Sequence, residues 1–161
     1  AGFPGLALRL VRPDLDVTLV DSTLKKIHFL QDQISCLELQ GARALHGRAE
    51  ELAREAGHRD RYDVAVARAV SALPELVELC LPLVRKGGIF IAMKGEEDER
   101  DQASRAVHLL KGRMEDLVVY SLPGLDHSRS LVIVRKRDRT PDRYPRRMAL
   151  IRKSPLQKDR P

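Results

Sequence analysis

Short apolar runs alternate with amphipathic or highly charged stretches along the chain. The apolar runs are rich in β-branched side chains and are bounded by charged residues or glycine, as is typical of strands in a sheet. They predict strands over residues 16–21, 42–46, 62–67, 89–93, 117–122 and 130–134. The stretches between them predict helices over residues 22–40, 48–55, 73–84 and 96–112. The pattern therefore predicts a chain in which strands and helices alternate.

The helix predicted over residues 22–40 has the most regular spacing of apolar positions. These positions fall at three- and four-residue steps, at Leu24, Ile27, Leu30, Ile34 and Leu37. Ser22 is a suitable N-cap, and Gly41 is a suitable residue just beyond the end of the helix.

This alternation of strands and helices indicates an α/β fold with a mostly parallel sheet. Only a turn around Pro123 and Gly124 separates the last two strands, so we expect them to form an antiparallel hairpin at one edge. A sheet of this kind binds its ligand at the carboxyl ends of its strands, where the strand order reverses. The residues that follow each strand are therefore the candidates for a binding site.

Composition narrows the class of protein further. The chain has 161 residues, of which 43% are hydrophobic, and this suits one domain with its own core. No run approaches the roughly eighteen apolar residues of a membrane-spanning helix. The cysteines, Cys36 and Cys80, form no CxxC pair, and the histidines show no ligand spacing, so no metal site is predicted. We expect Cys80 to pack on a helix face and not to act as a nucleophile.

The positive charge is concentrated at the C-terminus. Residues 135–161 hold 11 Lys or Arg and 3 Asp, whereas residues 1–134 hold 18 basic and 20 acidic side chains. We therefore expect a folded domain over residues 1–134 and a basic tail over residues 135–161. Such a tail binds phosphate on nucleic acid or on an anionic membrane. Its single aromatic residue, Tyr144, argues against base stacking and favours contact with a phosphate backbone.

Two features near the N-terminus favour a nucleotide-like ligand. The glycine-rich turn over residues 2–5 allows close approach of a ligand to the backbone, or it is only a corner before a helix. Asp21 ends the first predicted strand, where nucleotide-binding sheets place an acid that accepts hydrogen bonds from ribose hydroxyls. The alternative is that Asp21 and Ser22 only begin a capped helix.

Three further charged residues follow predicted strands. Glu50 lies at the depth expected for an adenine ring, although an acid in the first turn of a helix is equally well explained by the helix dipole. Arg68 follows a buried strand and is expected to face the cleft, the alternative being a solvated residue at a strand end. Lys94 occupies the equivalent place one strand further along the chain.

Several strings, in this order, resemble the small-subunit ribosomal RNA guanine methyltransferase family, also called glucose-inhibited division protein B. They are AGFPG (1–5), VRPD (11–14), LVDS (19–22), KKIHFL (25–30), HGRAEE (46–51), ARAV (67–70), LVRKGG (83–88), MKG (93–95) and YPRR (144–147), followed by Lys153, Pro155 and Leu156. The resemblance covers nearly the whole chain.

The resemblance implies a Rossmann-like methyltransferase fold and an activity. The family uses S-adenosylmethionine to methylate N(7) of one guanine in 16S ribosomal RNA. Carried over by position, the implied cofactor contacts are Phe3 in the pocket wall, Asp21, Ser22 and Thr23 around the ribose, Ala49 and Glu50 beside the adenine, and Arg68 near the cofactor. Charge alone adds Arg146, Arg147 and Lys153 as candidate RNA contacts. The implied partner is 16S ribosomal RNA or the small ribosomal subunit, in the cytoplasm and away from membranes, with a monomer expected for the complete protein.

The chain departs from the family pattern in two places. Ala149 and Ile151 stand where the family has a glycine and a proline, so a stiff turn in the tail is expected to be lost. The family also has an acidic residue and two more glycines before the position of Ala1, on a central strand. We therefore expect the first strand to be missing, cofactor binding to be weak, and the chain to be prone to aggregation.

The chemistry implied by the resemblance needs no named catalytic residue. Guanine N(7) carries an in-plane lone pair, so no proton has to leave and no general base is required. Two alternatives remain from the residues alone: a nicotinamide-dependent oxidoreductase of the Rossmann type, and a non-catalytic RNA-binding module that depends on the tail. The first lacks a His, Tyr or Lys constellation for hydride chemistry.

Overall fold

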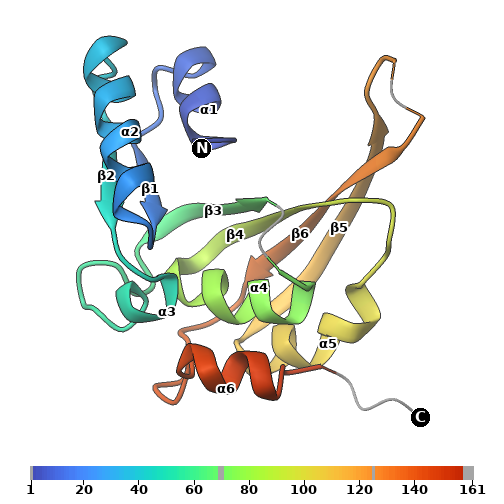
Figure 1. Cartoon of the computed structure of the whole chain (residues 1–161). Coiled ribbons are helices and arrows are strands. Elements are labelled where there is room, and N and C mark those ends of the chain that lie inside the picture. The colour runs from blue at the N-terminus through green and yellow to red at the C-terminus, as the bar shows by residue number, and fades with distance from the viewer. Residues whose placement is uncertain (1, 69–70, 125, 158–161) are drawn as a thin grey trace. The chain divides into compact units, whose positions relative to one another are not determined.

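The computed structural model describes residues 2–68, 71–124 and 126–157 (Figure 1). The chain forms two compact units, Ala1–Glu51 and Leu52–Pro161. Each unit has its own sheet and its own buried cluster, so each is described separately.

The first unit is a parallel pair of strands covered by helices. Its elements are α1 (Gly5–Val11), β1 (Val17–Asp21), α2 (Leu24–Cys36), β2 (Ala42–His46) and the beginning of α3 (Ala49–Leu52). The register of β1 and β2 runs from Val17 opposite Ala42 to Asp21 opposite His46. Its core consists of the buried residues Leu19, Ile27 and Leu30, with Leu6, Val17, Ile34 and Ala44 packed against them.

Helix α2 is shorter at both ends than the range predicted from spacing. It begins after Thr23, and not after Ser22, because the Asp21 carboxylate accepts a hydrogen bond from the Thr23 amide at 2.8 Å. It ends at Cys36 because the chain turns back towards β2 through Glu38 and Gly41, which have φ angles of 49° and 72°. Gly41, which was predicted to lie just beyond the helix, is therefore the last residue of a turn that begins after Cys36.

The second unit is a four-stranded mixed sheet packed against helices. Its elements are β3 (Tyr62–Arg68), α4 (Leu73–Cys80), the 3-10 helix η1 (Leu81–Leu83), β4 (Val84–Lys94), α5 (Arg100–Leu109), β5 (Gly112–Ser121), β6 (Ser128–Lys136) and α6 (Met148–Lys153). The strand order is β3-β4-β6-β5, with β3 and β4 parallel and the other pairs antiparallel. Helix α4 lies against β3, β4, α5 and α6 (Figure 1). Leu76, Val77, Phe90, Ala106 and Val134 are among the fully buried residues of this core.

Strand β4 extends further towards the N-terminus than predicted. The register with β3 shifts between Tyr62, opposite Val84, and Val64, opposite Ile89. Residues 85–88, which separate the predicted helix from the predicted strand, therefore lie inside β4, where the pairing is irregular. Gly88 is required there, because a Cβ at this position would lie 2.5 Å from the carbonyl oxygen of Asp63.

Every predicted strand is present, and the α/β fold with parallel pairs and an antiparallel edge hairpin is confirmed. Within the described residues β1 pairs only with β2, and β3 on its outer side pairs with no strand. The strands are consequently divided between two sheets.

The C-terminal segment is part of the second unit and includes a helix that spacing did not predict. The boundary expected at residue 134 falls inside β6, whereas the compact units divide after Glu51. Lys136, Tyr144 and Ile151 are buried in the second unit. Their positions follow from a set of buried polar contacts between this segment and the rest of the unit.

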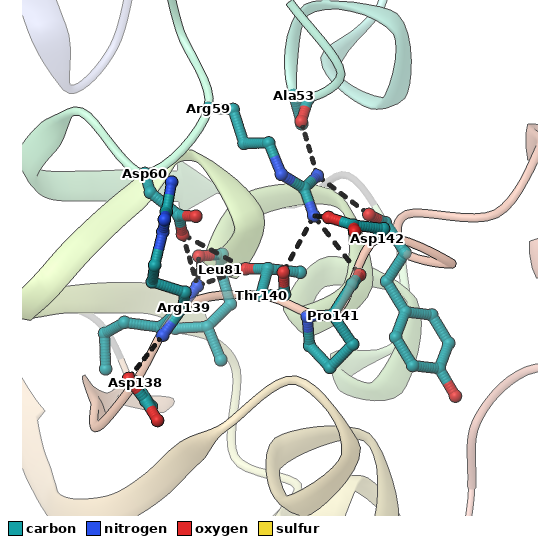
Figure 2. Close-up of polar contacts among 11 residues, drawn as sticks. Ala53, Arg59, Asp60, Leu81, Asp138, Arg139, Thr140, Pro141 and Asp142 are labelled. Carbon is teal, nitrogen blue, oxygen red and sulfur yellow. Dashed lines mark hydrogen bonds and ion pairs between the residues drawn. The ribbon is translucent and has the colours of Figure 1, made fainter. Parts of the chain in front are cut away.

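Arg59 makes several of these contacts (Figure 2). One guanidinium nitrogen donates to the carbonyl oxygens of Ala53 and Tyr144 at 2.9 and 2.8 Å, and the other donates to those of Thr140 and Pro141 at 2.9 and 3.2 Å. A single cation thus satisfies carbonyl groups on two segments that are far apart in the sequence. Because an unsatisfied carbonyl is costly when buried, this arrangement favours one path of the chain beyond β6.

Lys136 anchors the same segment from the end of β6. Its side chain is fully buried, and its Nζ donates to the carbonyl oxygen of Leu81 at 2.8 Å, to Asp60 Oδ1 at 3.0 Å and to the hydroxyl of Thr140. Burial lowers the pKa of Lys136, and the charge of Asp60 acts in the opposite direction. The net pKa lies below its ordinary value.

Arg146 forms a bidentate ion pair with the buried carboxylate of Glu78 on α4. Its Nε lies 2.8 Å from Oε1 and a terminal nitrogen lies 2.6 Å from Oε2. The backbone amide of Arg146 also donates to Oε1 at 2.9 Å. The hydrogen bonds that Arg146 donates to Glu78 raise the pKa of Arg146 further above its ordinary value. Because Glu78 is 0% exposed, its charge has to be neutralised inside the protein.

We expect Arg146→Ala to destabilise the second unit by about 3–5 kcal/mol, because Glu78 would remain as an unpaired buried charge. The measurement is the free energy of unfolding from urea titration. The matched control is Arg85→Ala, which removes a pair with Asp63 whose side chains are 52% and 78% exposed. That control should cost less than about 1 kcal/mol. Equal effects of the two substitutions would contradict the assignment.

Candidate functional site

The carboxyl ends of β1 and β2 bring two predicted site segments together. Asp21 is the register partner of His46, and the amide of Gly47 donates to the carbonyl oxygen of Asp21 at 3.1 Å. His46 Nε2 lies 3.1 Å from the carbonyl oxygen of Ser22. The loop that begins at Asp21 and the loop that leads into α3 are therefore neighbours, as parallel pairing requires.

Asp21 is an ionised acceptor at this strand end. Its side chain is 27% exposed, and its Oδ2 lies 3.2 Å from Lys26 Nζ while Oδ1 accepts from the Thr23 amide. Burial by itself raises the pKa of Asp21, but the hydrogen bonds from Thr23 and Lys26 outweigh it, and the net pKa lies below its ordinary value. A carboxylate has about four acceptor positions, so Asp21 retains capacity for two hydroxyl donors.

The structure supports the interpretation that Asp21 takes part in the start of α2, and the ribose contact stays a prediction. Its carboxylate receives the amide of the residue that precedes α2, as the capping interpretation required. Ser22 and Thr23 are exposed beside it, so the three residues implied as ribose contacts lie on one loop. Thr23 occupies the N-cap position and makes no side-chain capping hydrogen bond, and its side chain interacts with the Asp21 carboxylate.

Glu50 is more enclosed than Asp21. Its residue is 8% exposed and lies in the first turn of α3, directly after half-buried Ala49. The guanidinium of Arg48 is 3.9 Å from its carboxylate. This placement is compatible with both sequence interpretations, because a first-turn acid also interacts favourably with the helix dipole.

The glycine-rich turn precedes α1 in the same unit. Gly2 has a φ of 87° and accepts a hydrogen bond from the amide of Leu6 at 2.8 Å. Phe3 follows Gly2 and is 63% exposed, so this large apolar side chain is in contact with solvent.

Arg68 belongs to the second unit. It is the last residue of β3, is exposed, and lies opposite Met93 in β4. Lys94 follows Met93 and ends β4, where its Nζ lies 2.6 Å from Glu99 Oε1. Spacing alone gave no signal for Glu99, which lies in a stretch of mostly charged residues. Of the ARAV string, residues 69–70 lie outside the described residues.

The candidate RNA contacts differ in their surroundings. Arg146 is held by Glu78 and its side chain is 17% exposed. Arg147 and Lys153 are exposed at the beginning and the end of α6, and Arg152 is exposed beside them. Sequence reasoning missed both Glu78 as the partner of Arg146 and Arg152 as part of an exposed basic group, because neither the fold of the tail nor the helix was foreseen.

Other reactive groups add no second site. Within residues 2–68, 71–124 and 126–157, no group of three His, Cys, Asp or Glu side chains is arranged to hold a metal ion. Burial raises the pKa of the Cys80 thiol to about 12, which fits a packing residue. None of the helices in the described part of the chain has the length and apolarity needed to cross a membrane.

The arrangement of strands and helices is that of the S-adenosylmethionine-dependent methyltransferases. One similar solved structure is a SAM-dependent methyltransferase from Methanosarcina mazei, with a TM-score of 0.60 and 11% sequence identity. The match covers 82% of this chain and 87% of that chain. At this identity the likeness defines the fold.

The particular family follows from the sequence comparisons. The family model for rRNA small subunit methyltransferase G, GidB, matches residues 1–132. The chain is 48% identical to ribosomal RNA small subunit methyltransferase G of Deinococcus deserti, over 97% of this chain and 65% of the relative. It is 46% identical to the protein of that name from Clostridium botulinum strain Loch Maree, over 97% of this chain and 66% of the relative. The chain therefore belongs to the rRNA small subunit methyltransferase G family, and it spans about two thirds of the length of these relatives.

Proposed function

We propose that this chain carries the S-adenosylmethionine-binding part of an enzyme that methylates N(7) of a guanine in 16S ribosomal RNA. The observation that carries the proposal is the ionised Asp21 carboxylate at the end of β1, beside the loop that leads to Glu50. Family membership supports the same activity. A ribosomal RNA substrate places the proposed reaction in the cytoplasm.

The residues present fit the cofactor. Asp21 has acceptor capacity for the two ribose hydroxyls, with Ser22 and Thr23 exposed next to it. Ala49 and Glu50 would flank the adenine, whose exocyclic amine is a donor suited to a carboxylate. Phe3 offers an exposed ring for the pocket wall, and Arg68 is proposed to contact the cofactor region from the end of β3.

When bound, S-adenosylmethionine would supply an electrophilic methyl group. Because guanine N(7) already carries its lone pair, no residue of this chain has to remove a proton. The residues therefore act by binding and orientation, which are large contributions to rate when a nucleophile must be aligned. No group within the described residues is assigned as a general base.

The alternatives lack a supporting observation. The family and fold comparisons match methyltransferases, which does not favour a nicotinamide-dependent oxidoreductase. A purely RNA-binding module accounts for the basic residues around α6 but gives the Asp21 carboxylate only its structural role at the beginning of α2. The proposed enzyme has use for both the acceptor and the basic residues around α6.

Calorimetric titration with S-adenosylmethionine, with NAD as the control ligand, tests the cofactor. We expect saturable binding of S-adenosylmethionine and none of NAD, because the chain belongs to a methyltransferase family. Binding of NAD alone would support the oxidoreductase. A folded chain that binds neither ligand would contradict the proposal for this chain.

We expect Asp21→Asn to weaken S-adenosylmethionine binding about tenfold or more, equivalent to about 1.4 kcal/mol, because an amide offers one acceptor oxygen where the carboxylate offers two. Asp32→Asn, at an exposed position on α2, is the matched control and should leave the affinity unchanged. The measurement is the dissociation constant from calorimetry.

The pH dependence of that affinity provides a second readout. The pKa of Asp21 lies below the ordinary pKa of an aspartate. The carboxylate therefore stays ionised as pH falls towards the ordinary pKa. Affinity should therefore be constant between about pH 5 and about pH 8 as far as this group is concerned. It should fall only when pH drops through the lowered pKa, and a loss of affinity on raising pH would contradict the assignment.

The basic residues of α6 are proposed to contact the RNA backbone. Arg147 and Lys153 are exposed and free of ion pairs in the described part of the chain, as is Arg152 between them in sequence. Arg146 is proposed to act at the edge of this group, where Glu78 already holds its guanidinium. Phosphate contacts of this kind give affinity that falls with salt and carries little sequence information.

We expect Arg147→Ala and Lys153→Ala each to reduce the slope of log affinity against log salt by about 0.7–1 for 16S RNA. The control is Lys86→Ala, an exposed lysine paired with Asp138 on another part of the second unit. The measurement is RNA binding across a salt series. Unchanged slopes for both α6 variants would show that the RNA contacts lie elsewhere.

A further inference from the structure

The beginning of β5 and the end of β6 carry a group of basic side chains to which the proposed function assigns no role. Arg113 of β5 is the register partner of Arg135 of β6, and the amide of Arg137 donates to the carbonyl oxygen of Lys111 at 2.7 Å. These four residues therefore lie together at the open end of the β5–β6 hairpin (Figure 1). We refer to Lys111, Arg113, Arg135 and Arg137 as the β5–β6 basic array.

The array faces away from the helices of the second unit. Val134 is buried in the core cluster that includes residues of α4 and α5. Successive side chains of a strand point to opposite faces, so Arg135 points away from these helices. The side chains of Arg113 and Arg135 are 58% and 38% exposed, and Lys111 and Arg137 are exposed residues. Because α6 packs against α4, the array and the basic residues of α6 lie on different faces of the sheet.

Negative charge compensates only part of the array. The carboxylate of Glu115 lies 2.7 Å from Arg135 and 3.8 Å from Arg113. The hydrogen bonds that Arg135 donates, together with the positive charges of the array, hold the pKa of Glu115 below its ordinary value, although burial acts in the opposite direction. This carboxylate is therefore ionised and neutralises one of the two arginines of the first pair.

The other two cations of the array have no carboxylate of their own. The side chains of Lys111 and Arg137 make no ion pair within residues 2–68, 71–124 and 126–157. Asp138 follows Arg137, but its ion pair, at 3.4 Å, is with Lys86. Like charges placed opposite each other on adjacent strands are destabilising. The array therefore costs the folded protein stability, and a negatively charged partner would offset that cost.

The array lies far from the candidate site residues of the same unit. Arg135 is opposite Ile89 in β4. Lys94, which ends β4 next to the register partner of Arg68, lies five residues beyond Ile89. Five residues of a strand span about 17 Å. A nucleic-acid strand in a duplex advances about 3.4 Å along its axis per nucleotide, so this distance corresponds to about five nucleotides.

We propose that the β5–β6 basic array binds the phosphate backbone of the RNA substrate at nucleotides outside the reacting centre. The inference rests on the proposed function for its RNA partner and adds a contact surface separate from α6. The array has four cations and no aromatic side chain, so it fits a phosphate backbone better than stacked bases. RNA that occupies both surfaces has to reach two faces of the sheet, which a large folded RNA can do.

RNA binding across a salt series tests the array with Lys111→Gln and Arg137→Gln, which remove the two cations without an ion pair. Each substitution should reduce the slope of log affinity for 16S RNA against log salt by about 0.7–1. The free energy of unfolding should not fall, because each substitution relieves repulsion within the array. Arg43→Gln, at an exposed arginine of β2 in the first unit, is the matched control and should leave the slope unchanged.

Steady-state methyl transfer to 16S RNA gives a second readout. KM for RNA should rise with the dissociation constant, while kcat stays within about twofold of the wild type, because a contact remote from the reacting centre binds the ground state and the transition state equally. The change in salt slope for Arg137→Gln should add to that for Arg147→Ala, since the two residues lie on separate surfaces.

Three results would overturn the inference. They are unchanged salt slopes for both array variants, a fall in kcat with no change in RNA affinity, and a loss of RNA affinity that only follows a loss of folding free energy. If both variants instead lose binding to phosphatidylglycerol vesicles while RNA binding is unchanged, the array belongs to a membrane surface.

Failure of the proposed function gives a different result. A wild-type chain that binds 16S RNA but transfers no methyl group would refute the methyltransferase activity, and the salt slopes would still decide the role of the array. A folded wild-type chain that does not bind 16S RNA would overturn the inference.

Discussion

In each unit two strands run parallel, and the polar loops that carry the candidate residues follow the carboxyl ends of those strands. Parallel neighbours end on the same side of a sheet, so residues separated by a helix in the sequence come together there. This constraint places Asp21 beside the loop that leads to Glu50 in the first unit. In the second unit it places Arg68 beside the end of β4, where Lys94 lies. The proposed cofactor contacts of Asp21 and Glu50 depend on that pairing.

Buried charge determines the path of the C-terminal segment. Arg59, Lys136 and Arg146 are cations whose partners lie inside the second unit, and each connects residues that are distant in the sequence. Removing one partner would leave an uncompensated charge, so these contacts are specific as well as stabilising. Among the described basic residues of this segment, Lys136 and Arg146 make internal contacts, whereas Arg147, Arg152 and Lys153 are exposed at α6. A count of charges in the sequence does not distinguish the two uses.

Local pattern predicted the elements well because it depends on neighbouring residues. The period of apolar side chains located every strand, and the spacing from Leu24 to Leu37 located α2. The errors fall where contacts from elsewhere intervene. The Asp21 carboxylate moved the beginning of α2, and β4 includes residues 85–88, where Gly88 lies close to Asp63. The buried side chain of Ile151 lies in a helix of a segment without periodicity.

The sequence by itself determined the alternation of elements, the family and the identity of the candidate residues, because these depend on side-chain period and on strings of residues in order. Only the tertiary structure decided which charges are used internally. Glu78 lies on a helix face that sequence spacing treats as ordinary, and its pairing with Arg146 joins residues 68 positions apart. Glu99 likewise became the cap of a helix that begins 26 positions before it. Such pairings depend on chain topology and on the cost of burying an unpaired charge, and neither can be read from neighbouring residues.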